Sequence, residues 1–151
     1  MMNNHSTRSR LAAVAVAALV AGGCGGGGSD GGGAANKAEW EKKHGSVVSV
    51  VSDDIDRSVQ ALNAGQRPIL LSECTQLMED LAGARKAVPA PDATVDAALR
   101  TAFEATGTAV ATCVDGARIA SDASIIEKAQ REMKVAREKY DAARSAIEAW
   151  Q

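Results

Sequence analysis

The stretch IEKAQREMKVAREKYDAARSAIEAW, residues 126–150, decides the fold class of this 151-residue chain. Its apolar and small side chains recur at alternating spacings of three and four residues, at Ile126, Ala129, Met133, Ala136, Tyr140, Ala143, Ile147 and Trp150. An α-helix turns once in about 3.6 residues, so this spacing places all of them on one face. The stretch therefore predicts a long amphipathic helix that buries that face.

Two segments upstream show the same alternating spacing of apolar and small side chains. Residues 68–88 carry apolar or small side chains at the same spacing; Pro68 suits the first turn of a helix, and Pro89 marks its end. Residues 93–119 do the same after Asp92, whose side chain suits an N-cap. Both segments predict helices.

A fourth helix is expected over residues 48–62, closed by Gly65 in the left-handed conformation that ends many helices. We expect Gly45 to break or kink the chain, leaving residues 36–44 as a separate turn or two. Four helices joined by short turns predict an all-α fold: an Ala-rich, antiparallel up-down four-helix bundle over residues 36–151, with one disulfide.

The disulfide is expected between Cys74 and Cys113. Each lies on the inward stripe of its helix, about six residues from a turn at the same end of the expected bundle. The alternatives are two buried thiols acting as small apolar side chains, or a redox-active pair, which the absence of a CxxC spacing disfavours.

The N-terminus has the pattern of an export signal. Arg8 and Arg10 precede an unbroken apolar run, Leu11–Ala21, which is too short to span a bilayer. Two glycines ending at Gly23 then precede Cys24. This segment resembles a bacterial lipoprotein signal peptide. The resemblance implies cleavage between Gly23 and Cys24 and attachment of lipid to the Cys24 sulfur.

The expected organisation then has three parts. Residues 1–23 form the cleaved signal, and residues 24–35 form the acylated cysteine with a flexible linker, because the tract Gly25–Gly33 has nothing to bury. Residues 36–151 form the bundle, which resembles the small helical lipoproteins of GC-rich bacteria. That likeness implies no particular activity. An ordinary secretory signal cleaved nearby is the alternative to the lipoprotein.

The sequence offers little catalytic or metal-binding chemistry. His44 is the only histidine after the signal and is expected on the solvated surface, so no catalytic residue is assigned. Asp53, Asp54 and Asp56 lack the loop spacing of a calcium site and are expected on a solvated face. We expect no metal and no cofactor.

Trp40 and Trp150 are expected to be neighbours at the tethered end of the bundle. They either close the core there or contact the membrane or a partner protein, since indole suits such interfaces.

The net charge of the chain limits the kinds of partner that it can bind. The net charge of −2 becomes more negative once Arg8 and Arg10 leave with the signal, which argues against binding nucleic acid. We therefore expect an exported lipoprotein on the outer face of the cell membrane or on an outer membrane, not an enzyme, whose helical domain contacts another envelope protein. The alternative is a small-ligand or carrier module with a cleft between helices, although the alanine stripes predict close packing with little room for a cavity.

Overall fold

The computed structural model describes residues 30–119 and 123–151, and nearly all of them are helical. The elements in chain order are α1 (Asp30–Trp40), the π-helical turn η1 (Glu41–Gly45), α2 (Ser46–Ala64), α3 (Arg67–Ala84), the 3-10 turn η2 (Arg85–Ala87), α4 (Ala93–Arg118) and α5 (Ala123–Ala149). These described residues contain no strand. The all-α prediction is confirmed.

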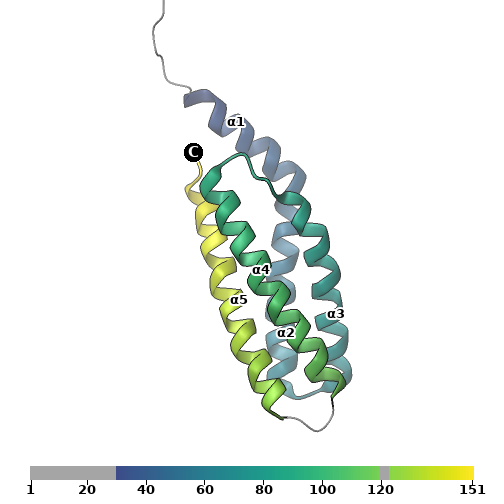
Figure 1. Cartoon of the computed structure of the whole chain (residues 1–151). Helices are drawn as coiled ribbons and strands as arrows, with labels where there is room; N and C mark the ends of the chain where they lie inside the picture. Colours follow the sequence, from purple (N-terminus) through teal and green to yellow (C-terminus); the bar gives the residue numbers. More distant parts are fainter. Residues whose placement is uncertain (1–29, 120–122) are drawn as a thin grey trace, which may run out of the picture.

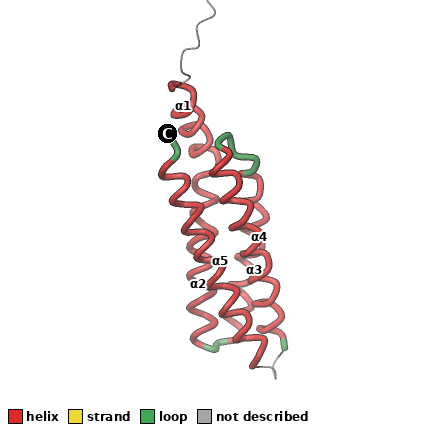
Figure 2. Tube along the Cα trace, turned by 60° about the vertical axis from the view of Figure 1, so that its left-hand side comes forward, coloured by secondary structure: helices red, strands yellow, loops and turns green. Residues whose placement is uncertain are grey.

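The helices α2, α3, α4 and α5 lie side by side (Figures 1 and 2). The α2–α3 turn, the last residues of α4 and the first residues of α5 lie at one end, whereas the α3–α4 loop, α1 and the C-terminus lie at the other (Figure 1). Each long helix packs on two neighbours, because α2 contacts α3 and α5, and α4 contacts α3 and α5.

Local chemistry sets two of the helix ends as predicted. Asp92 has an extended backbone, and its Oδ1 accepts hydrogen bonds from the N–H groups of Thr94 and Val95, each at 2.9 Å. This is the N-cap of α4. Gly65 has a φ of 66°, and its N–H bonds back to the carbonyls of Ala61 and Leu62, which ends α2.

The first helical segment differs from expectation, since α1, η1 and α2 form one continuous helical path from residue 30 to 64. Gly45 has α-helical dihedrals and does not break the chain. The expected coil over Gly25–Gly33 also ends early, because Asp30 already begins α1.

The π turn has a clear packing consequence. Two α-helical turns take about seven residues, and a π turn adds about one more. Trp40 and Val48, eight residues apart, can therefore share the buried face, and both are buried. A regular α-helix through Gly45 would rotate the indole away from the core.

The core follows the alternating stripe of α5. Ala129, Met133, Ala136 and Tyr140 are fully buried. Small side chains let α5 approach α4 closely, and this pair of helices makes the most extensive contact in the bundle. The seam between α2 and α5 is the least extensive of the four.

Candidate functional site

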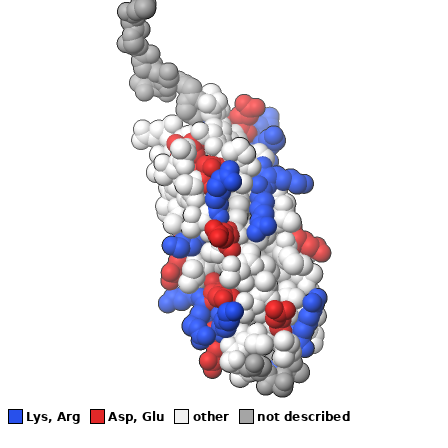
Figure 3. Space-filling view, viewed as in Figure 1, with Lys and Arg blue, Asp and Glu red and all other residues white. Residues whose placement is uncertain are grey.

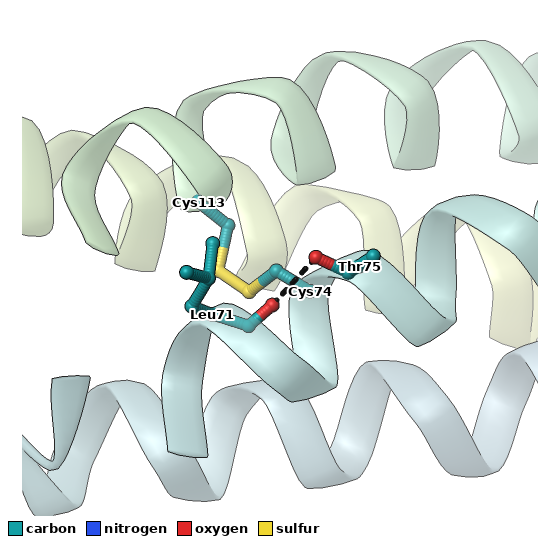
Figure 4. Close-up of a disulfide and its surroundings, with 4 residues drawn as sticks. All are labelled: Leu71, Cys74, Thr75 and Cys113. Atoms are coloured by element: carbon teal, nitrogen blue, oxygen red, sulfur yellow. Dashed lines mark hydrogen bonds between the residues drawn. A yellow bond between two sulfur atoms is a disulfide. The ribbon is translucent and has the colours of Figure 1, made fainter. Parts of the chain in front are cut away.

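Cys74 of α3 and Cys113 of α4 form the predicted disulfide, with their Cα atoms 6.1 Å apart. Both cysteines are fully buried. Figure 4 shows Leu71 beside the bridge and the Thr75 hydroxyl donating to the Leu71 carbonyl at 2.7 Å. Its location in the core, closing 39 residues of chain, indicates a structural cross-link and not an exposed redox pair.

Trp40 and Trp150 meet at the end where α1 enters the bundle, as predicted. Their ring centroids are 5.8 Å apart in an edge-to-face arrangement. The Trp40 indole N–H donates to the Ala87 carbonyl at 3.0 Å, and Lys37 Nζ donates to the Trp150 carbonyl at 2.8 Å. Only 5% of Trp40 and 8% of Trp150 are exposed, which favours the interpretation that they close this end of the core.

His44 is half-buried and not fully solvated as expected. Its ring centroid lies 5.8 Å from that of Trp40, one helical turn back. Partial burial, and then the charge of Lys43, lower the pKa of His44 below its usual value. The neutral imidazole is therefore favoured at neutral pH.

The three aspartates of α2 do not share one solvated face. Asp54 is almost fully buried and pairs with Arg57, which also bonds through Nε to Glu73 of α3 at 3.1 Å. Asp56 pairs with Arg137 across to α5, whereas Asp53 is exposed. The expectation of a solvated face is wrong for Asp54, because it lies three residues after the buried Val51 and so faces the core.

Buried polar atoms accompany Asp54. Its Oδ2 and the hydroxyl of Ser58, one turn further on, have no hydrogen-bond partner within residues 30–119 and 123–151. The side of α2 that faces α3 therefore carries polar groups that the sequence pattern concealed.

Two hollows lie one after the other along the seam between α2 and α5, which run side by side in Figure 2. The first, here the Trp40 hollow, has a volume of about 370 Å³ and is lined among others by Trp40, Val48, Ser52, Asp53, Arg144 and Ile147. The second, here the Arg137 hollow, has a volume of about 420 Å³ and is lined among others by Asp56, Val59, Leu62, Lys134, Arg137 and Glu138. Both hollows open to the surface on the α2–α5 seam and have no lining residue from α4, so they lie outside the α4–α5 contact for which close packing was expected.

Ser52 is the unusual polar group of the Trp40 hollow. It is 6% exposed and makes no hydrogen bond with any described residue. Hydroxyls elsewhere in these helices, such as those of Thr75, Thr106 and Ser145, donate to the carbonyl four residues earlier. Ser52 does not follow this pattern.

The reason lies at the Val48 carbonyl. One of its lone pairs accepts the helical N–H of Ser52, and the other accepts the buried hydroxyl of Tyr140. Burial raises the pKa of Tyr140 far above its usual value, so this hydroxyl stays protonated and remains a donor. Ser52 is thereby left with its hydroxyl at the wall of the hollow.

Charged side chains of both signs are interspersed over the face formed by α4 with α3 and α5 beside it (Figure 3). On the outer side of α5, Arg137 lies 3.3 Å from Asp141, and Arg144 lies 3.9 Å from Glu148. Exposed pairs of this kind contribute little to stability. The visible face therefore offers no large surface of a single charge.

Some sequence predictions fall on residues that the structure does not describe. The expected cleavage site at Gly23 and the expected lipidation site at Cys24 lie outside the described residues. In the part that is described, no group of three or more histidine, cysteine, aspartate or glutamate residues is arranged to hold a metal ion. No described helix combines the length and the apolar character needed to cross a membrane.

Comparisons with known proteins give no relatives. No protein-family model, curated protein or solved structure matches the chain.

Sequence reasoning missed both hollows and the role of Ser52. The hollow walls come chiefly from α2 and α5, which are far apart in the chain (Ser46–Ala64 and Ala123–Ala149), so no local spacing marks them. The stretch from Ser46 to Leu62 did contain a signal, because Ser52 stands one turn from the buried Val48 and Ser58 one turn from the buried Leu62. Hydroxyls this close to a buried stripe can be predicted to lie at its edge.

Proposed function

We propose that this chain is an exported lipoprotein, anchored through Cys24, whose helical part is a non-enzymatic binding module for another envelope protein. In this proposal the four long helices form an antiparallel up-down bundle, and the partner binds along the α2–α5 seam. The places of the described helix ends in Figure 1, where the end of α2, the start of α3, the end of α4 and the start of α5 lie together, support the bundle topology.

The observation that carries the binding role is the alignment of the two hollows along one seam. Their lining residues on α2 run from Val48 to Asn63, so the two hollows together form an elongated groove along most of that helix. Val48, Val59 and Leu62 contribute apolar surface beneath charged side chains at the edges. A groove of this form suits an amphipathic helix or an extended segment, which uses apolar anchors and a polar rim.

The proposed anchor fits the position of α1. Asp30 lies six residues after Cys24, a span of at most about 20 Å when fully extended. An acylated Cys24 would hold the Trp40 end of the bundle near the membrane. The seam would then rise away from the lipid surface, where a neighbouring protein could reach it.

Site-specific photo-cross-linking in the native host tests the seam. A photoreactive amino acid replaces Gln130, which is exposed and lines the Arg137 hollow, or Glu104, which is exposed on α4. We expect a discrete cross-linked adduct from position 130 and a weaker one or none from position 104. Equal adducts from both positions, or none from position 130, would contradict the proposal.

Metabolic labelling with a fatty acid tests the anchor separately. The wild-type chain should carry the label and sediment with membranes, and Cys24→Ala should lose both properties. A labelled Cys24→Ala chain, or an unlabelled wild-type chain, would rule out lipidation at this cysteine.

The second candidate function is a small-ligand module, and the Trp40 hollow favours it. Its volume of about 370 Å³ lies within the range of small-molecule sites, and it combines apolar surface with a few polar groups.

A further inference from the structure

We propose that the Trp40 hollow binds a small organic cation, with the ammonium group held by the carboxylates of Glu41 and Asp53 and the apolar part seated against Trp40 and Ile147. This inference rests on the second candidate function, binding in the α2–α5 groove, and gives it a ligand chemistry. It does not depend on the lipid anchor or on a protein partner.

The first argument is the charge of the hollow. Three carboxylates line it, those of Glu41, Asp53 and Glu148, against the single guanidinium of Arg144. Glu148 is already opposed by Arg144 at 3.9 Å. Glu41 and Asp53 make no ion pair or hydrogen bond with any described residue. Two negative charges are therefore left without a partner at the rim.

The Arg137 hollow provides the comparison on the same seam. There, Asp56 and Glu138 are balanced by Lys134 and Arg137, and Asp56 is paired with Arg137. The two hollows have similar volumes but different charge. The excess negative charge is therefore a local property of the Trp40 hollow and not of the whole seam.

The second argument is the hydroxyl of Ser52, which lines the hollow and bonds to no described residue. Ser52 as a whole is only 6% exposed, so the hollow is the place where its hydroxyl can find a further hydrogen-bond partner. Because Tyr140 occupies the Val48 carbonyl, Ser52 can turn its oxygen to a donor in the hollow. A protonated amine has donors and no acceptor, which matches a hydroxyl oxygen and two carboxylates.

The third argument is the apolar surface beside these groups. Trp40, Val48 and Ile147 line the same hollow, so a ligand with both a charged head and an apolar body can contact both kinds of surface. An indole also attracts a cation placed against its ring face. An inorganic cation would leave this apolar surface unused.

The test is a titration of the full-length chain, in non-ionic detergent, with three ring compounds of the same shape. Cyclohexylammonium carries a positive charge, cyclohexanol none, and cyclohexanecarboxylate a negative charge. Calorimetry and the emission of the tryptophans report binding. We expect saturable binding of the ammonium with a dissociation constant on the order of 1 mM, at least tenfold tighter than either analogue.

Four variants locate the site. Asp53→Asn and Glu41→Gln should each weaken ammonium binding by about fivefold, the upper range for an exposed charge pair. Ser52→Ala should weaken it by a similar factor without lowering the midpoint of unfolding, since Ser52 bonds to no described residue. Glu138→Gln, a matched loss of one carboxylate in the Arg137 hollow, should leave the affinity unchanged.

A blocking variant separates binding from folding. Gly45 lines the hollow, and a Cβ added there would meet only the Glu41 Cβ, at an ordinary 3.8 Å. Gly45→Leu should therefore fold and fill the hollow, with at least a tenfold loss of affinity. Retained binding in a folded Gly45→Leu variant would overturn the assignment of the site.

Two outcomes of the titration also overturn the proposal. One is the absence of saturable ammonium binding, and the other is equal or tighter binding of cyclohexanol or the carboxylate. The cation could be a free amine or the lysine side chain of a partner, so Nα-acetyl-lysine amide is titrated in parallel. Comparable binding of this compound supports the proposal with a partner lysine as the source, and weaker binding supports it with a free amine.

The cross-linking experiment at position 130 is independent of these titrations. A cross-link without amine binding would retain the seam as a protein-binding surface and reject the cation site. Amine binding without a cross-link would retain the cation site and reject the seam as a protein-binding surface.

Discussion

Replacing Tyr140 with phenylalanine tests the competition for the Val48 carbonyl that leaves Ser52 without a partner. The substitution removes one hydroxyl and keeps the ring, whose centroid lies 6.4 Å from that of Phe103. The lost hydrogen bond is worth about 1 kcal/mol of stability. The Val48 carbonyl then has a free lone pair, one helical turn from the Ser52 hydroxyl.

The expected loss of unfolding free energy depends on whether the Ser52 hydroxyl then donates to the Val48 carbonyl. If Ser52 donates to Val48, as Thr106 does to Ala102 at 2.8 Å, about half of the loss is regained. Tyr140→Phe should then cost about 0.5 kcal/mol in the wild-type background and about 1 kcal/mol in the Ser52→Ala background. The difference is a coupling of about 0.5 kcal/mol between two side chains that do not bond to each other.

Urea unfolding of the four proteins of this double-mutant cycle measures the coupling, provided that their m-values agree. A second measurement is the affinity for cyclohexylammonium. It should fall by about fivefold in Tyr140→Phe, although Tyr140 is buried behind the hollow, because the Ser52 hydroxyl would turn away from the ligand. Additive stability losses together with unchanged amine affinity would refute the reasoning.

Three further predictions concern stability. Replacing Cys74 and Cys113 with alanine should lower the free energy of unfolding by about 4 kcal/mol, from the entropy of closing 39 residues of chain; calorimetry checks this, and a loss below about 1 kcal/mol would argue against a structural role. Asp92→Ala removes the N-cap of α4 and should cost about 1 kcal/mol in urea unfolding, whereas Asp92→Asn, which keeps an acceptor oxygen, should cost much less. The lowered pKa of His44 means that the unfolded state binds more protons as the pH falls through the histidine range. Stability should therefore decline from about pH 7 to about pH 5.5, and the decline should be shallower in His44→Asn; identical pH profiles would contradict this.

The parts of the fold that sequence predicted are those fixed by local chemistry. Asp92 is an N-cap because of its own side chain, and Gly65 ends α2 because it tolerates a positive φ. The stripe of α5 is visible because every member lies on one helix. The pairing of Cys74 with Cys113 needed only the direction of each helix and the position of the turns.

The parts that sequence did not predict depend on geometry between helices. The π turn at Glu41–Gly45 moves Trp40 into register with Val48 by a single extra residue, a shift too small to read from spacing. Asp54 lies on the buried face of α2, although an acidic side chain is expected to be exposed to solvent. The hollows lie on the α2–α5 seam, where the contact between helices is less extensive than between α4 and α5, and the extent of such a contact is not visible in the pattern of one helix.

The continuous path through α1, η1 and α2 has a mechanical consequence. Figure 1 shows α1 inclined to α2, with the change of direction near η1. Tension applied at Asp30 would act first to straighten this bend. The Lys37 bond to the Trp150 carbonyl and the Trp40 bond to the Ala87 carbonyl resist that movement. These two bonds tie the α1 end of the helical path to the C-terminus and to η2, apart from the long packing of α2 on α3 and α5.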